Sequence, residues 1–402
     1  MKKSYLAVFS VLIVLLLLVS ACAQPTPTPV PPAPTEAPTE APTEAPTEAP
    51  PAAETPAEEE PTAETPEAAE TPEAAETPAE EEPTTAPAEG PVRVGMITDV
   101  GGIDDASFNA TSWLGVERAI EELGVQGQYL ESQQQTDYAR NITEFLQQNY
   151  DLIITVGFLL GEDTATFAQE NPDVPFAIVD FAYDPPIDNV LGLTFATDEA
   201  AFLAGYLAAG MTETGTVGTF GGLEIPTVTI FMQAYAQGVA HYNEVHGTDV
   251  QVLGVDFFVG NFESTDDGRR AGESLMDEGA DIIMPVAGPV GLGTAAVVQE
   301  RGGMLVGVDT DWTVSAPEYE DIVLTSVLKK MDVAVFDAIQ AVIDGTFEGG
   351  TYVGTLENDG VGLAPFQTFE DQVPQDLKDE LAELQQQVLA GEVWTGWGEQ
   401  PE

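Results

Sequence analysis

The stretch Ile97–Asn109, ITDVGGIDDASFN, decides how this 402-residue chain folds. The apolar run Val92–Thr98 leads into it, and a pattern typical of a helix begins at its end. A strand that runs through a polar turn into a helix is the repeating unit of α/β proteins, and ligands bind where such strands end. We therefore expect the turn to lie at a binding site and the later chain to repeat the same unit.

Strands and helices alternate from Val92 to the end of the chain. Apolar runs such as Leu152–Val156 and Ile282–Val286 have the length of buried strands, and helical patterns lie between them. This alternation predicts parallel sheets with helices on both faces, the α/β class. More than about ten candidate strands are too many for one sheet. We therefore expect two lobes that bind ligand between them, at the carboxyl ends of the strands.

The N-terminal segment 1–22 has the pattern of a secretory signal. Lys2 and Lys3 precede the apolar run Leu6–Val19, and small residues follow. The tetrapeptide VSAC, which ends at Cys22, resembles the lipobox of bacterial lipoproteins. This resemblance implies cleavage before Cys22 and attachment of diacylglycerol to its sulfur. The alternative is an uncleaved membrane anchor, and both interpretations predict an exported protein held at the membrane.

Residues 23–91 consist largely of repeated Ala-Pro-Thr-Glu units and their variants. Proline every few residues prevents helix formation, and the segment has too few large apolar side chains to build a core. Glu is its only charged residue type, so repulsion between like charges extends it. We expect a stiff tether that reaches on the order of 200 Å when fully extended. A low-complexity insertion without function is the alternative.

The chain is strongly acidic, with 69 Asp and Glu residues against 11 Lys and Arg and a net charge of −58. Such a surface repels nucleic acid, phosphorylated metabolites and anionic lipid, so no nucleic-acid partner is expected. The expected ligand is neutral or cationic. Solubility in a salty or acidic medium is the favoured cause of this charge. The single cysteine, Cys22, excludes an internal disulfide and a cysteine-based zinc site.

Three aspartates come directly after apolar runs, namely Asp99, Asp180 and Asp309. If their strands are parallel, the three carboxylates converge on one cleft. Ionised carboxylates only accept hydrogen bonds, so they suit the hydroxyl and amino groups of a sugar or a ribose. The alternative is that each caps the helix that follows it. In the first of these turns we expect Asp104 and Asp105 to be turn and capping acids.

A pair of lysines and two aromatic residues also stand out. Lys329 and Lys330 are two of only three lysines after residue 91, and we expect them where a helix opens. There they either orient the carboxylates and contact ligand oxygens or balance surface charge. Phe108 and Phe262 lie in polar loops, where a large ring either covers the core or stacks on a flat ligand. From the residues alone, covering the core is the favoured role.

Signals for catalysis are weak. The histidines His241 and His246 are five residues apart, which does not place them on one helical face as a zinc pair. The segment Asp99–Ala106 loosely resembles the calcium loop of nucleoside hydrolases. However, Ile97 stands in place of that motif's first acid, and one extra residue precedes the Asp pair. We therefore expect a protein that is not an enzyme and holds neither cofactor nor metal.

Several long motifs together resemble the basic membrane protein family of bacterial substrate-binding lipoproteins, which includes purine nucleoside receptors. They cover almost all of residues 92–366 and include ITDVGGIDDASFNATSWLGVERA from Ile97, LIITVGFLLGEDTATFAQENPDVPFAIVD from Leu152, ADIIMPVAGPVGLG from Ala280, GVDTDW from Gly307 and LTSVLKKMDVAVFDAI from Leu324.

This resemblance implies a periplasmic-binding-protein type I fold, with two Rossmann-like lobes joined by three crossing segments. We expect lobe 1 at about 92–196 plus about 309–345, and lobe 2 at about 197–308 plus about 346–402. The resemblance also implies a monomer, anchored by Cys22 on the extracytoplasmic face of the cell membrane, that delivers a purine nucleoside to an ABC permease. A sensor for another small neutral solute and a calcium-dependent nucleoside hydrolase remain alternatives.

The family's base-binding residues correspond to five positions of this sequence. By this resemblance Asp99 and Asn109 contact the base, and Ser107 lies beside them. Phe108 and Phe262 lie on the two faces of the base.

Three further positions correspond to the ribose-binding residues of the family, and a fourth corresponds to a glycine beside the ligand. Asp180, Asp309 and Lys329 hold the ribose hydroxyls. Gly288 lets the backbone approach the ligand. The resemblance therefore implies a single pocket in which the strand-end acids, one lysine and two aromatic rings surround a nucleoside.

Overall fold

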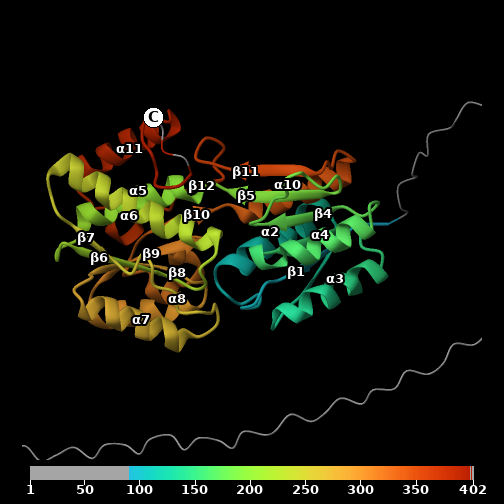
Figure 1. Cartoon of the computed structure of the whole chain (residues 1–402), viewed down its shortest axis with the longest axis horizontal. Helices are drawn as coiled ribbons and strands as arrows, with labels where there is room; N and C mark the ends of the chain where they lie inside the picture. The colour runs from blue at the N-terminus through green and yellow to red at the C-terminus, as the bar shows by residue number, and fades with distance from the viewer. Residues whose placement is uncertain (1–89, 399, 401–402) are drawn as a thin grey trace, which may run out of the picture. The chain divides into compact units, whose positions relative to one another are not determined.

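The computed structural model of the protein describes residues 90–398 and 400 (Figure 1). The expected signal segment, with Cys22, lies outside these residues, as does the expected tether up to residue 89. Among the described residues, no helix is both long and apolar enough to cross a membrane.

Two six-stranded sheets form the centres of two lobes. In lobe 1 the strands lie in the order β11 (Gly350–Gly354), β5 (Val190–Phe195), β4 (Phe176–Val179), β3 (Leu152–Val156), β1 (Arg93–Ile97) and β2 (Gln126–Leu130). In lobe 2 the order is β12 (Val361–Leu363), β10 (Val323–Lys329), β9 (Met304–Asp309), β8 (Ile282–Val286), β6 (Thr216–Gly221) and β7 (Gln251–Leu253). All neighbours are parallel except β10 and β12, which confirms the predicted α/β fold.

Helices cover both sheets (Figure 1). Those of lobe 1 are α2 (Phe108–Leu123), α3 (Tyr138–Gln147), α4 (Gly161–Glu170) and α10 (Met331–Asp344). Those of lobe 2 are α5 (Thr197–Met211), α6 (Pro226–His246), α7 (Thr265–Asp277), α8 (Val290–Arg301), the short α9 (Trp312–Ser315) and α11 (Gln375–Leu389). Helices α2 and α10 pack together on lobe 1, and the pairs α5–α6 and α7–α8 pack together on lobe 2.

The chain crosses between the sheets three times: between β5 and α5, between β10 and α10, and between β11 and β12. Two strands near the C-terminal end lie in the other lobe from the one that we expected. Residues 323–329 form β10 in the sheet of lobe 2, and residues 350–354 form β11 in the sheet of lobe 1. An apolar run indicates a buried strand but does not indicate which of two similar sheets it joins, because side-chain packing far away in sequence decides this.

Helices α5 and α6 of lobe 2 lie in unusually close contact. This contact holds α6 in place against α5, the helix that directly follows the first crossing between the lobes. A Cβ atom added to Gly205 of α5 would lie 2.0 Å from the carbonyl oxygen of Tyr235, and one added to Gly238 of α6 would lie 1.9 Å from that of Phe202. Each glycine therefore lets the backbone of the other helix approach where any side chain would collide with it.

The Gly238→Ala variant tests this contact. We expect its free energy of unfolding to fall by about 2 kcal/mol, because the added methyl group must separate the two helices despite the better helix propensity of alanine. Urea unfolding measures the change. Gln233→Ala, an exposed substitution on the same helix, should stay within about 0.5 kcal/mol of the wild type. A Gly238→Ala protein as stable as the wild type would contradict the close packing.

Candidate ligand-binding site

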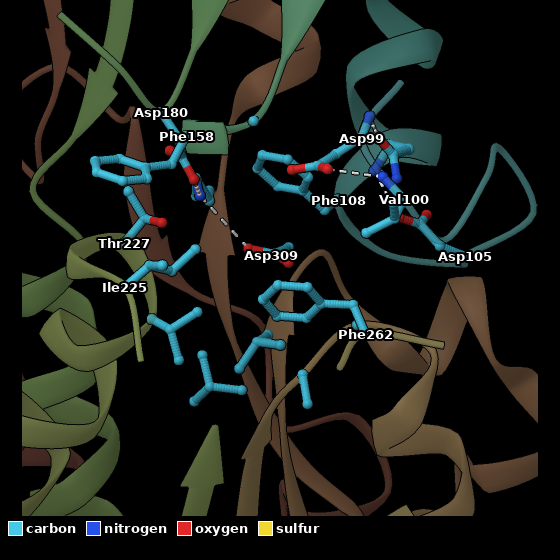
Figure 2. Close-up of a pocket in the computed structure, with 18 of the residues that line it drawn as sticks. Asp99, Val100, Asp105, Phe108, Phe158, Asp180, Ile225, Thr227, Phe262 and Asp309 are labelled. Carbon is cyan, nitrogen blue, oxygen red and sulfur yellow. Dashed lines mark hydrogen bonds and ion pairs between the residues drawn. The ribbon is translucent and has the colours of Figure 1, made fainter. Parts of the chain in front are cut away.

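A pocket lies between the two lobes and is lined by residues at the carboxyl ends of strands from both sheets (Figure 2). Its empty volume is about 600 Å³, which includes some open space at its mouth. Eight of the nine residues expected to bind ligand line it: Asp99, Phe108, Asn109, Asp180, Phe262, Gly288, Asp309 and Lys329. The ninth, Ser107, is buried and donates a hydrogen bond to Asp309 Oδ2 at 2.8 Å. The structure thus brings all nine together, and their contacts with a ligand stay a prediction.

Asp105 fixes the turn that carries three of these residues. Its carboxylate accepts hydrogen bonds from the backbone N–H groups of Ser107 at 3.0 Å, Asn109 at 2.7 Å and Ala110 at 2.9 Å. These are donors at the start of α2 that would otherwise lack a partner. Burial raises the pKa of Asp105 to about 6. The capping role expected for Asp105 is therefore confirmed, but Asp105 also lines the pocket, which was not expected, and Asp104 is exposed.

Asp99 and Asn109, which we call the acceptor–donor pair, lie at one end of the pocket. The backbone N–H of Asp99 donates to Asn109 Oδ1 at 3.1 Å, which leaves the Nδ2 group of Asn109 as a donor. Asp99 Oδ1 accepts from Val100 N at 2.7 Å and from the hydroxyl of Tyr138, whereas Oδ2 accepts from no group among the described residues. The pair therefore offers one acceptor and one donor to a ligand.

Asp180, Asp309 and Lys329, which we call the strand-end triad, form an ion cluster between the lobes. The ammonium of Lys329 lies 2.6 Å from Asp180 Oδ2 and 3.8 Å from Asp309 Oδ1, and Lys329 is only 2% exposed. Burial raises the pKa of Asp180, and the charge of Lys329 lowers it. The triad thus links lobe 1, through Asp180, to lobe 2.

Both aspartates of the triad have left-handed backbone conformations, with φ of 66° at Asp180 and 68° at Asp309. Asp adopts this region more easily than most residues, but at some cost compared with glycine. Gly157, with φ of 121°, follows β3 at the same edge of the sheet. A Cβ atom there would lie 2.3 Å from Asp99 Oδ2, so only glycine leaves room for that carboxylate. Gly288 also has a positive φ, of 54°, and a Cβ atom there would meet open space.

Aromatic rings form much of the remaining wall. The Lys329 ammonium lies 4.7 Å from the centroid of the Phe108 ring. The Phe262 ring rests on Gly222, where a Cβ atom would lie 2.2 Å from the ring. Figure 2 shows the Phe108 and Phe262 rings with Asp309 between them in this view, and the Phe158 ring beside Asp180. Phe108 and Phe262 are half-buried and line the pocket, so they do not serve the core alone.

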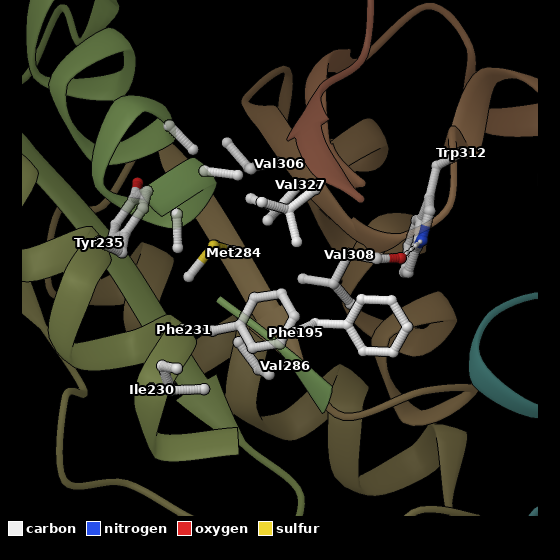
Figure 3. Close-up of a cluster of buried hydrophobic side chains, with 14 of the residues drawn as sticks. Phe195, Ile230, Phe231, Tyr235, Met284, Val286, Val306, Val308, Trp312 and Val327 are labelled. Carbon is white, nitrogen blue, oxygen red and sulfur yellow. Dashed lines mark hydrogen bonds between the residues drawn. The ribbon is translucent and has the colours of Figure 1, made fainter. Parts of the chain in front are cut away.

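Several lining residues were not expected from the sequence, namely Val100, Phe158, Ile225, Thr227, Val228 and Phe231. Phe158 directly follows β3 and its glycine, which is the signal that identified the strand-end acids, so it could have been found. Phe231, Val286 and Val308 belong both to the pocket wall and to the apolar core of lobe 2 (Figure 3). Nothing in the sequence distinguishes them from ordinary core residues.

The expected place of the lysines was wrong for Lys329. It is the last residue of β10, where it pairs with Val361 of β12, and α10 begins at Met331. The strand extends this far because it is held on both sides, by β9 and by β12. The side chain of Lys329 therefore enters the pocket from a strand end, as the aspartates do.

The histidines lie away from this pocket. His246 Nε2 is 3.0 Å from Glu380 Oε2 and 3.2 Å from the hydroxyl of Tyr206, at the end of α6. Among the residues that the structure describes, no group of three or more His, Cys, Asp or Glu side chains is placed to hold a metal ion.

The Lys329→Met variant tests the triad through pH. Without the ammonium the pKa of Asp180 rises further, so the folded protein keeps a proton to higher pH than the unfolded chain does. Stability relative to the wild type is then lost as pH rises. We expect a deficit of about 3 kcal/mol at pH 8 and a smaller one at pH 5, measured by urea unfolding. The control Lys330→Met should leave the free energy of unfolding almost unchanged at both pH values. If Lys329→Met were destabilised by the same amount at pH 5 and pH 8, the ion cluster would be contradicted.

Comparisons with known proteins support the same fold and class. Residues 92–391 match the family described as ABC transporter substrate-binding protein PnrA-like. An uncharacterized lipoprotein of Pyrococcus abyssi is 32% identical over 326 residues, which cover 75% of this chain and 80% of that protein. The ABC transporter nucleoside-binding protein BmpA of Lactococcus lactis is 28% identical over 321 residues, which cover 75% of this chain and 88% of BmpA.

A solved structure agrees with these sequence matches. The crystal structure of an ABC transporter solute-binding protein from Aeropyrum pernix K1 superposes with a TM-score of 0.71 at 29% identity, and it covers 76% of this chain and 93% of that one. The family indicated by the sequence motifs is thus confirmed, and this chain belongs to the PnrA-like family of ABC transporter substrate-binding proteins.

Proposed function

We propose that this protein captures a purine nucleoside between its two lobes and delivers it to an ABC importer. The observation that carries the proposal is that one pocket holds a hydrogen-bonding pair suited to a base, two aromatic rings and a buried ion cluster suited to a ribose.

The acceptor–donor pair suits the edge of a purine. Asp99 Oδ2 accepts a hydrogen bond and Asn109 Nδ2 donates one, and purines carry an N–H group next to an oxygen or nitrogen acceptor. The rings of Phe108 and Phe262 would then stack on the base, which contributes about 1–3 kcal/mol per ring. Pairing and stacking together favour a planar heterocycle over a flexible solute.

The strand-end triad suits ribose hydroxyls. Asp180 and Asp309 accept from hydroxyl groups, and the Lys329 ammonium donates to a hydroxyl oxygen. Among the described residues that line the pocket, Lys329 is the one lysine or arginine, and its ammonium is already shared between two carboxylates, which leaves no unpaired cation there for a phosphate. Together with the acidic surface, this favours a nucleoside over a nucleotide.

The role in transport rests on the family and on the N-terminal sequence. BmpA of Lactococcus lactis is named as a nucleoside-binding protein of an ABC transporter, and the relative from Pyrococcus abyssi is named as a lipoprotein. We infer that Cys22 carries the lipid and holds a monomer at the extracytoplasmic face of the membrane. Binding by closure of the lobes requires no bond to be made or broken in the ligand.

Calorimetry against a panel of nucleosides tests the proposed ligand. We expect inosine, guanosine or adenosine to bind with a Kd below about 10 μM, and the matching 5′-monophosphate to bind at least about tenfold more weakly. If no purine nucleoside binds this tightly, the proposed specificity is wrong.

The same mixtures are then analysed for free base by chromatography. Release of base would replace the binding role with that of a nucleoside hydrolase.

The Phe262→Ala variant tests the stacking wall. We expect the Kd for the best nucleoside of the panel to rise at least about fivefold, because one face of the base loses its aromatic partner. Phe257→Ala is the matched control: Phe257 belongs to the same loop region, is 38% exposed and does not line the pocket. Equal effects of the two substitutions would contradict the role of Phe262.

A further inference from the structure

Tyr138 lies directly behind the acceptor–donor pair and does not line the pocket itself. It is the first residue of α3 and is 1% exposed. Its hydroxyl donates to Asp99 Oδ1, which also accepts from the backbone N–H of Val100 at 2.7 Å. That oxygen therefore has two donors from the protein.

The other oxygen of Asp99 is left for the ligand. Oδ2 accepts from no group among the described residues and lies against Gly157, which lines the pocket. The carboxylate cannot turn to exchange its oxygens without breaking the bond from Tyr138. The side chain of Asp99 is thus held in one orientation from the side opposite the ligand.

We propose that Tyr138 is a positioning residue of this pocket: its hydroxyl occupies one oxygen of Asp99, presents the other to the N–H group of the ligand, and couples ligand binding to the protonation of Asp99. The proposal rests on the proposed function in one respect, which is that an N–H group of the ligand donates to Asp99.

The surroundings of Asp99 place its titration in an accessible pH range. Burial raises the pKa of Asp99 to about 6, the bond from Tyr138 lowers it, and the charge of Asp180 across the pocket raises it. Burial raises the pKa of the Tyr138 phenol, and the charges of Asp99 and of Asp163 in α4 raise it further. Tyr138 therefore stays protonated and remains a donor, whereas Asp99 gains a proton as the pH falls through about 6.

Ligand affinity should follow this titration. A protonated Asp99 no longer accepts at both oxygens, so an N–H group of the ligand loses its partner. The affinity then falls below pH 6, by at most about tenfold per pH unit for a single proton. Removal of the Tyr138 hydroxyl takes away a bond that favours the ionised form, so the fall must begin at higher pH.

The first experiment measures the Kd of inosine from pH 5 to pH 8 by calorimetry on the full protein. Tyr138→Phe should bind up to about threefold more weakly than the wild type at pH 8, because Asp99 is held less firmly, and its further loss of affinity should begin at higher pH than in the wild type. The control Tyr150→Phe should follow the wild type, because Tyr150 donates to Gln128 at 2.7 Å outside the pocket. A loss of affinity by the same factor at every pH, or an unshifted profile, would overturn the proposal.

The second experiment needs no ligand and so separates this inference from the proposed function. Because the pKa of Asp99 is raised in the folded state, its contribution to stability falls as pH rises from about 4 through 6. Measured by urea unfolding, the decrease in stability with pH should extend to higher pH in Tyr138→Phe than in the wild type. In a protein that already carries Asp99→Asn, adding Tyr138→Phe should leave the pH dependence of stability unchanged. If inosine does not bind but the stability profiles differ as stated, the proposed nucleoside is wrong, whereas the effect of Tyr138 on the protonation of Asp99 is confirmed.

A titration of the wild type covers the case in which Tyr138→Phe does not fold. Carbon-13 NMR follows the carboxyl groups, and the signal of Asp99 is identified by its loss in Asp99→Asn. A midpoint near pH 6 is expected. A midpoint near 4, the value of an unperturbed Asp, would overturn the coupling to protonation.

Discussion

The pocket depends on the burial of one ammonium group. A cation taken out of water loses several kcal/mol of solvation, and only close anions offset that loss. Lys329 is buried in the presence of Asp180 from one lobe and Asp309 from the other, at 2.6 and 3.8 Å. Lys329 also ends the strand that leads into one of the three crossing segments. The same ion cluster therefore joins the lobes next to this crossing segment and supplies charged groups to the wall of the pocket.

The internal repeat of the fold explains why these groups meet. Strands β5, β4, β3, β1 and β2 of lobe 1 occur in the same spatial order as β10, β9, β8, β6 and β7 of lobe 2. Asp180 follows β4 and Asp309 ends β9, so the two acids occupy corresponding edges of the two sheets, and both have left-handed backbones. Lys329 ends β10 where Phe195 ends β5, so one repeat supplies the cation and the other an apolar ring that lies 5.6 Å from it.

The sequence predicted those parts of the site that are encoded locally. A polar residue directly after an apolar run identified Asp99, Asp180 and Asp309, because in a parallel sheet such positions share one edge. It did not predict that Lys329 ends a strand, because pairing with β9 and β12 determines where β10 ends. Tyr138 gave no signal either, since a tyrosine at the start of an amphipathic helix reads as an ordinary core residue. What the sequence could not show is thus set by contacts between segments that lie far apart in the chain.

The triad places charged groups at two positions where glycine would fit the backbone conformation better. Glycine at positions 180 and 309 would relieve the left-handed backbone, yet both positions carry a carboxylate that must be desolvated. The apolar side chains beneath the pocket, among them Phe231, Val286 and Val308, belong to the main core, and their burial offsets part of this cost. Removing Lys329 would leave two buried carboxylates without a cation, so the two acids of the triad depend on that one ammonium group. The close contacts among Asp180, Lys329, Asp309 and Ser107 hold these side chains in place before a ligand arrives, so that little of the binding energy is spent on ordering them.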